Sequence, residues 1–137
     1  MSELVRQSAV LAVSDDRLCL VTSRGGRRWV IPKGQIDPGH TPGEAALVEA
    51  WEEAGLVGTL DPEPVGTYVY EKLGRTHHVL VYRMGVTEAH ETYPEVAARQ
   101  RAWVTVDEAI DRIDEPGLRD ILRRLFHAAH PDQLSVG

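Results

Sequence analysis

Apolar residues recur along this chain with the spacing of strands in its first half and near its middle. The segments SAVLAV (8–13) and LCLVTS (18–23) are apolar and flank four polar residues, which predicts a β-hairpin. Shorter apolar or alternating runs predict further strands, and these lie at 28–32, 56–60, 64–71, 77–86 and 101–106. Residues 87–99 have no such pattern and are expected to form a loop.

The last part of the chain changes to helical spacing. VDEAIDRI predicts a short helix, and Pro116 begins a longer one that is expected to reach His130. Four apolar residues repeat at helical spacing in it, and we expect them to pack in the core: Leu118, Ile121, Leu122 and Leu125. Strands combined with a few helices indicate an α/β or α+β sandwich.

The clearest single element is a helix predicted at 42–54. Thr41 has the properties of an N-cap, Pro42 suits the first helical position, and Glu44 completes a capping box. Gly55 follows as the C-terminal stop. Both ends of this helix can therefore be placed from sequence.

Three glutamates, Glu49, Glu52 and Glu53, gather on one side of this helix. At about 100° per residue, Glu52 lies about 60° to one side of Glu49 and Glu53 about 40° to the other. The opposite side carries residues available for packing, namely Leu47, Ala50, Trp51 and Ala54. Like charges this close repel, so the cluster is either a solvated acidic face or a site for a hard cation such as Mg²⁺ or Mn²⁺.

The length and composition favour one soluble domain, residues 1–137, with 42% hydrophobic and 26% charged residues. No apolar run approaches the about 20 residues of a membrane span, so no membrane association is expected. The segment MSELVRQSAV does not have the pattern of a signal peptide. The single cysteine, Cys19, lies in an apolar stretch and is expected to be a buried thiol, which fits a cytoplasmic location.

The net charge of −6 argues against a general nucleic-acid partner. Four basic residues nevertheless fall within ten positions, directly before the acidic helix: Arg24, Arg27, Arg28 and Lys33. A basic patch beside an acidic cluster suits an anionic ligand that arrives with a metal ion.

The stretch GQIDPGHTPGEAALVEAWEEAGL (34–56) resembles the Nudix box, G-x5-E-x7-R-E-U-x-E-E-x-G-U with U apolar. The box positions are matched by Gly34, Glu49, Ala50, Glu52, Glu53, Gly55 and Leu56. Two positions depart from it, because His40 replaces the first glutamate and Val48 replaces the arginine. In the family these two side chains commonly hold each other, so losing both leaves no unpaired charge and retains the three glutamates. His40 is then a plain loop residue, a replacement brace, or a phosphate or metal contact.

The segments TSRGGRRWVIPKG and RTHHVLVYRMGVTEAHETYPEVAARQRAWVTVDEAI extend the resemblance to the diphosphoinositol polyphosphate phosphohydrolase branch. The resemblance implies a Nudix α/β/α sandwich with a mixed β-sheet. It also implies hydrolysis of a phosphoanhydride in a diphosphoinositol polyphosphate or a dinucleoside polyphosphate, with Mg²⁺ or Mn²⁺ as cofactor.

By position, the resemblance implies roles for individual residues. Glu49, Glu53 and the main-chain carbonyl of Lys33 match metal ligands, and Glu52 matches a proton acceptor. Substrate contacts are expected from basic and polar residues around the box, namely Ser23, Arg24, Arg28, Lys33, Gly34, Arg75, His77 and Arg99.

Three functions remain open at this point. The chain is expected to be a hydrolase acting on an anionic polyphosphate, as a monomer or homodimer. The alternatives are hydrolysis of another nucleotide, such as ADP-ribose or a nucleoside triphosphate, and a non-catalytic Nudix module that binds a nucleotide. Specificity is expected to reside in the loops 71–77 and 87–99, whose conformations the sequence does not give.

Overall fold

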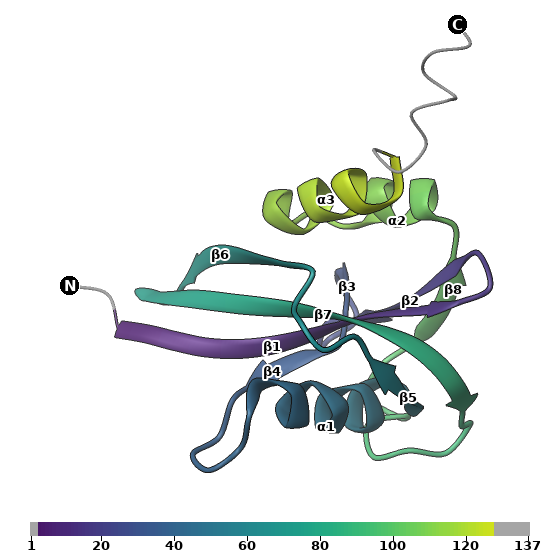
Figure 1. Ribbon diagram of the computed structural model, residues 1–137, viewed down its shortest axis with the longest axis horizontal. Coiled ribbons are helices and arrows are strands. Elements are labelled where there is room, and N and C mark those ends of the chain that lie inside the picture. Colours follow the sequence, from purple (N-terminus) through teal and green to yellow (C-terminus); the bar gives the residue numbers. More distant parts are fainter. Residues whose placement is uncertain (1–2, 128–137) are drawn as a thin grey trace, which may run out of the picture.

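A twisted mixed sheet lies between helix α1 on one face and helices α2 and α3 on the other (Figure 1). The computed structural model describes residues 3–127. The strands are β1 (Glu3–Ser14), β2 (Arg17–Thr22), β3 (Trp29–Val30), β4 (Lys33–Gln35), β5 (Leu56–Leu60), β6 (Gly66–Lys72), β7 (Arg75–Ala89) and β8 (Arg101–Val104). The helices are α1 (Pro42–Ala54), α2 (Val106–Arg112) and α3 (Pro116–Leu122), and a π-helical segment, η1 (Arg123–His127), follows. The expected α/β/α sandwich with a mixed sheet is confirmed.

The sheet is organised around the long strands β1 and β7. These two run parallel, in register from Glu3 opposite Arg75 to Val13 opposite Gly85. The other pairings are antiparallel: β2 and β4 on β1, β5 and β6 on β7, and β3 and β8 on β2. The parallel pair makes the sheet mixed, and it brings segments about 70 residues apart in sequence side by side.

Both faces of the sheet are buried, and β1 shows how one strand serves both. Ala9 and Leu11 point toward the α2–α3 side, whereas Val10 and Ala12 point toward α1. All four side chains are inaccessible to solvent. Strands buried on both faces have nearly continuous apolar runs, which explains why SAVLAV shows little alternation. Cys19 is also fully buried, as expected.

Helix α1 has the predicted ends. The Thr41 side chain accepts a hydrogen bond from the Glu44 backbone NH, and the Glu44 side chain accepts one from the Thr41 NH. Pro42 occupies the first turn, and Gly55 ends the helix in the left-handed conformation with φ 68°. A left-handed cap is favourable for glycine because it has no Cβ.

Several boundaries differ from the prediction. The expected strand 28–32 is shorter, at Trp29–Val30, and β4 was not expected. β7 continues to Ala89 because Leu56 of β5 pairs with it there, so the loop begins only at residue 90. These segments owe their extended form to distant pairing partners, which local periodicity does not show. The C-terminal helix changes to the π-helical segment η1, and residues 128–130 of its expected span, including His130, lie outside the described part.

The packing face of α1 also differs. Leu47 is 42% exposed, so its expected packing role is wrong. The buried face contains Ala46, Ala50 and Ala54, and it also includes Glu53. Compared with the expected packing face, the buried face of α1 is therefore shifted toward the glutamates. As a result Glu53 is buried, and Glu49 and Glu52 are half-buried. Within residues 3–127, no helix has the length and apolarity required to traverse a membrane.

Candidate active site

A cleft of about 430 Å³ opens on the α2–α3 side of the sheet. Its walls come from the 23–33 segment, from β6, and from the connection between α2 and α3. The lining residues are Ser23, Arg24, Arg28, Trp29, Val30, Ile31, Lys33, Glu53, Tyr68, Tyr70, Glu71, Lys72, Arg99, Ile113, Asp114, Glu115 and Leu118. We call this the cleft throughout.

Six residues expected from the sequence lie together in the cleft: Ser23, Arg24, Arg28, Lys33, Glu53 and Arg99. They are up to 76 positions apart in the chain, since Ser23 and Arg99 both contribute. Ser23 is also part of the turn that carries the arginines, because its hydroxyl accepts a hydrogen bond from the Arg28 backbone NH at 3.2 Å. The fold thus gathers the basic segment and one glutamate of the box at a single opening.

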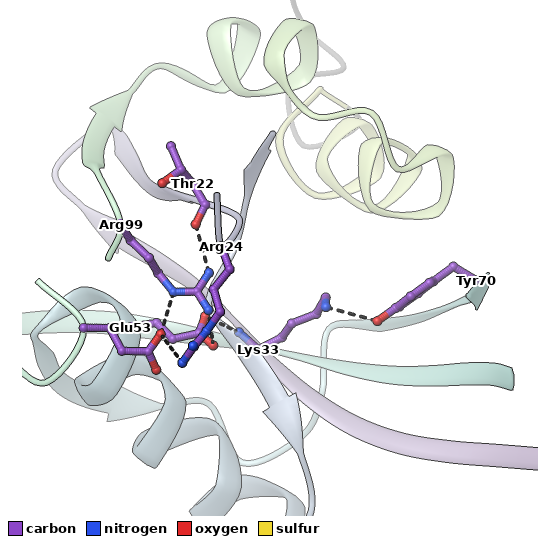
Figure 2. Close-up of polar contacts among 7 residues, drawn as sticks. Thr22, Arg24, Lys33, Glu53, Tyr70 and Arg99 are labelled. Carbon is purple, nitrogen blue, oxygen red and sulfur yellow. Dashed lines mark hydrogen bonds and ion pairs between the residues drawn. The ribbon is translucent and has the colours of Figure 1, made fainter. Parts of the chain in front are cut away.

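Glu53 is the buried acid of the site, at 6% exposed. One carboxylate oxygen accepts a hydrogen bond from the Lys33 backbone NH at 3.2 Å, and the other lies 3.4 Å from Nη2 of Arg99 (Figure 2). Burial raises the pKa of Glu53, while Arg99 and the Lys33 NH act in the opposite direction. Its charge is thus held in a place where an isolated carboxylate would be unfavourable.

Arg99 connects three parts of the chain. Its guanidinium donates to the Thr22 carbonyl oxygen at 2.9 Å and to the Glu95 carboxylate at 2.8 Å, in addition to the Glu53 contact. Glu95 also lies 3.6 Å from Arg24, whose side chain is mostly exposed. Figure 2 shows the side chains of Arg24 and Arg99 beside Glu53.

Glu95, which contacts both Arg24 and Arg99, was not predicted as a site residue from the sequence. It lies in the 87–99 segment, and its backbone NH donates to the Glu52 carbonyl oxygen at 2.9 Å, which fixes that segment against α1. The only sequence signal was its spacing of four residues from Arg99, which is common on protein surfaces.

Glu49 lies against the backbone of Gly34. A Cβ at position 34 would overlap the Glu49 carboxylate, so glycine is required for this approach. Burial raises the pKa of Glu49 to about 8, and the negative charges of Glu53 and Glu52 add to the effect. The side chains expected to bind metal are thus crowded together, and Gly34 has a steric role that its position in the box did not reveal.

The Glu52 side chain is half-buried, and it makes no hydrogen bond or ion pair with residues 3–127. It does not line the cleft as defined here. Its assignment as proton acceptor stays a prediction.

The residues present fit a divalent ion whose ligands are shared with substrate. No group of three or more His, Cys, Asp or Glu side chains within residues 3–127 is arranged to hold a metal by itself. Two carboxylates, Glu49 and Glu53, do crowd beside the Lys33–Gly34 backbone. Mg²⁺ is usually held by one or two carboxylates, with water and substrate phosphates completing its shell. Two crowded carboxylates with raised pKa values are therefore a suitable donor set, and the carbonyl of Lys33 remains the predicted further ligand.

Lys33 is positioned by Tyr70, an aromatic residue that the sequence did not single out. Its Nζ donates to the Tyr70 hydroxyl at 3.0 Å (Figure 2). That hydroxyl donates to Gln7 at 2.8 Å. Tyr68 and Tyr70 occupy alternate positions of β6 and both line the cleft. Trp29 lines it from β3.

Six candidates do not line the cleft, namely Gly34, His40, Glu49, Glu52, Arg75 and His77. Arg75 pairs with Glu3, and His77 stacks on the Tyr70 ring at 4.5 Å between centroids. His40 is exposed in the loop before α1, where its backbone NH donates to the Asp37 carbonyl oxygen. The fold does not bring Arg75 or His77 to the basic cluster, and their contacts with substrate stay predictions.

The comparisons with known proteins point in one direction. The sequence is 31% identical over 125 residues to human diphosphoinositol polyphosphate phosphohydrolase 2, which covers 90% of this chain and 64% of that protein. It is 36% identical to the bovine diphosphoinositol polyphosphate phosphohydrolase 3-beta, over 90% of this chain and 71% of that protein. This chain thus spans less than two thirds of the human relative.

The fold has close counterparts among solved structures. A C. elegans Ap4A hydrolase in a binary complex superposes with a TM-score of 0.74 at 22% identity, covering 93% of this chain and 98% of that chain. A NUDIX hydrolase from Nitrosomonas europaea gives 0.73 at 23% identity, covering 93% and 90%. The sequence profile of the NUDIX domain matches residues 4–125. The chain, with its box glutamates on α1 and its basic cleft, therefore belongs to the NUDIX domain family.

Proposed function

We propose that residues 1–137 act as one Nudix hydrolase unit that cleaves a phosphoanhydride bond in a polyphosphate, with Mg²⁺ or Mn²⁺ as cofactor. The observation that carries the proposal is the crowding of Glu49 and Glu53 beside the Lys33–Gly34 backbone, at the basic end of the cleft. Relatives named as hydrolases of diphosphoinositol polyphosphates and of Ap4A support it. A cytoplasmic location is proposed on the single buried thiol, Cys19.

The residues have separate tasks in this proposal. Glu49 and Glu53 hold the divalent ion, which when bound neutralises phosphate charge and lowers the pKa of water. Arg24, Arg28 and Lys33 bind the phosphates that do not react and align them. Glu52 accepts the proton of the attacking water.

The neighbouring contacts prepare this arrangement. Tyr70 directs the Lys33 ammonium along the cleft wall, and the Lys33 NH orients the Glu53 carboxylate. In the metal-free state, Arg99 neutralises Glu53. A bound cation would take over that role, and Arg99 would then be available to the phosphates.

The test is a panel of polyphosphates incubated with the purified protein and Mg²⁺, with release of phosphate-bearing products as the measurement. Glu53→Gln is expected to lower the rate by at least about 100-fold and Glu52→Gln by a comparable factor, because one loses metal and the other loses the proton acceptor. Glu63→Gln, an exposed glutamate outside the cleft, is the matched control. Binding without turnover across the whole panel would favour a non-catalytic module and refute the proposal.

A further inference from the structure

The charged groups of the cleft are unevenly distributed. Its cations are Arg24, Arg28, Lys33, Lys72 and Arg99, and its carboxylates are Glu53, Glu71, Asp114 and Glu115. The cleft therefore has five cations and four anions. One cation, Arg99, and one anion, Glu53, neutralise each other. Arg24 belongs to the Glu53 end, where it approaches Glu95. Asp114 and Glu115 lie on the wall formed by the α2–α3 connection.

This distribution discriminates between two kinds of polyphosphate. A diphosphoinositol polyphosphate carries phosphates around its ring, so any bound orientation directs negative charge toward the carboxylate wall. Like charges brought together without a counterion repel. A nucleoside polyphosphate concentrates its charge at one end and presents an uncharged base and a ribose diol at the other.

Trp29 provides a flat surface beside this wall. The half-buried Trp29 side chain lines the cleft, and the Arg112 guanidinium covers one face of its ring at 5.4 Å from the centroid. A backbone bridge joins Trp29 to Ile113, so Asp114 follows directly after the residue paired with the tryptophan. Aromatic rings bind nucleobases by stacking, with little dependence on which base is present.

Asp114 has the capacity to accept new hydrogen bonds. It is exposed and makes no hydrogen bond or ion pair among residues 3–127. Glu115, in contrast, already caps α3 by accepting a hydrogen bond from the Gly117 NH at 3.2 Å. Carboxylates accept hydrogen bonds from ribose hydroxyls in other nucleotide sites.

We propose that Trp29 and Asp114 are specificity-determining residues of the cleft, with Trp29 stacking a nucleobase and Asp114 accepting hydrogen bonds from the ribose diol. The cleft then selects nucleoside polyphosphates over diphosphoinositol polyphosphates. This inference rests on the proposed function for the position of the phosphates at the Arg24 and Lys33 end.

Calorimetric titration without metal tests the selection apart from catalysis. The ligands are ADP, inorganic pyrophosphate and inositol hexakisphosphate. Wild type is expected to bind ADP about tenfold more tightly than pyrophosphate, because a carboxylate hydrogen bond and stacking are added. Asp114→Ala is expected to remove most of that difference and leave pyrophosphate binding unchanged. Equal binding of ADP and pyrophosphate, or tightest binding of inositol hexakisphosphate, would overturn the proposal.

Matched variants separate specificity from folding. Asp111→Ala removes an exposed carboxylate of α2 outside the cleft and is expected to leave all three affinities unchanged. Trp29→Leu removes the ring, and Trp29→Phe is expected to restore part of the ADP affinity. Because Trp29 also packs on the core, circular dichroism must show both variants folded. If either variant is unfolded, the proposal is tested by the ADP and pyrophosphate affinities of Asp114→Ala.

A second measurement distinguishes this inference from the proposed function. With Mg²⁺, kcat/KM is compared for diadenosine tetraphosphate and inorganic tripolyphosphate in wild type and Asp114→Ala. A selective loss of about tenfold on the dinucleotide supports the inference. An equal loss on both substrates overturns it and leaves the hydrolase proposal intact. If no substrate is cleaved but ADP binding depends on Asp114, the hydrolase proposal fails and the specificity assignment stands.

Discussion

Arg99 forms an ion pair with Glu53 at 3.4 Å, and the two side chains are only 10% and 8% exposed. The pair joins the connection between β7 and β8 to the acidic face of α1. Charges this far from solvent are costly unless each has its partner. The contact therefore explains how a buried glutamate of the box is tolerated in the metal-free protein.

Replacing Arg99 should destabilise the metal-free protein. Arg99→Ala leaves the carboxylates of Glu53 and Glu95 without their guanidinium partner and frees the Thr22 carbonyl oxygen. We expect a loss of about 3 kcal/mol in the free energy of unfolding, measured by urea denaturation with EDTA. Arg27→Ala, an exposed arginine outside the cleft, is the control and is expected to be neutral. Equal stability of the two variants would contradict the structural role of Arg99.

Glu49 should make the stability of the metal-free protein depend on pH. Its pKa is raised from 4.5 to about 8 by burial and by the neighbouring glutamates, so the folded state binds more protons than the unfolded state between these values. The free energy of unfolding should therefore fall as pH rises from about 4.5 to about 8. Glu49→Gln should flatten this slope, as measured by denaturation at several pH values in EDTA. An identical slope in wild type and variant would show that Glu49 does not titrate in this way.

The proton on the Glu49 carboxyl should compete with a bound metal ion. Mg²⁺ requires the carboxylate form of Glu49, whose side chain is protonated at pH 6 and about half ionised at pH 8. The rise in melting temperature caused by Mg²⁺ should therefore be larger at pH 8 than at pH 6. Thermal denaturation with and without Mg²⁺ measures it. In Glu49→Gln, the rise in melting temperature with Mg²⁺ should be small at both pH values. A rise that does not depend on pH in the wild type would argue against Glu49 as a metal ligand.

Gly34→Ala should damage the site with little effect on the strand. The added methyl group would overlap the Glu49 carboxylate and move it. We expect kcat/KM to fall at least about tenfold, because displaced ligands misplace the reacting groups. Gly85→Ala is the matched control, since a Cβ there meets no atom within 4 Å. The prediction fails if both substitutions leave activity unchanged.

Tyr70 and Lys33 should act as a unit. Tyr70→Phe removes the hydroxyl that accepts from the Lys33 ammonium, and Lys33→Met removes the charge. We expect Tyr70→Phe to raise KM by about threefold to tenfold with a smaller change in kcat. In a double-mutant cycle its effect should vanish once Lys33 is methionine. Additive effects would show that Tyr70 does not act through Lys33.

His40→Ala should keep most of the activity. His40 is exposed and outside the cleft, so kcat/KM is expected to stay within about twofold of wild type. A loss comparable to that of Glu53→Gln would show that His40 contacts phosphate or metal.

The sequence by itself determined the elements whose signals are local. The capping box at Thr41 and Glu44 and the stop at Gly55 define α1 through contacts between residues at most five apart. The β1–β2 hairpin and the stripe of Leu118, Ile121 and Leu122 were likewise visible as periodic patterns. The spacing of Glu49, Glu52 and Glu53 also indicated an acidic face before any fold was known.

Only the tertiary structure decided which of those side chains are buried and what they meet. Glu95 and Thr22 join Arg99, Tyr70 reaches Lys33, and Asp114 comes beside Trp29 through contacts between distant segments. The α1 helix likewise presents Glu53 rather than Leu47 to the interior because the sheet fixes its rotation. Periodicity reports which residues share a face, but the position of that face depends on partners far away in the chain, and so does the chemistry of the cleft.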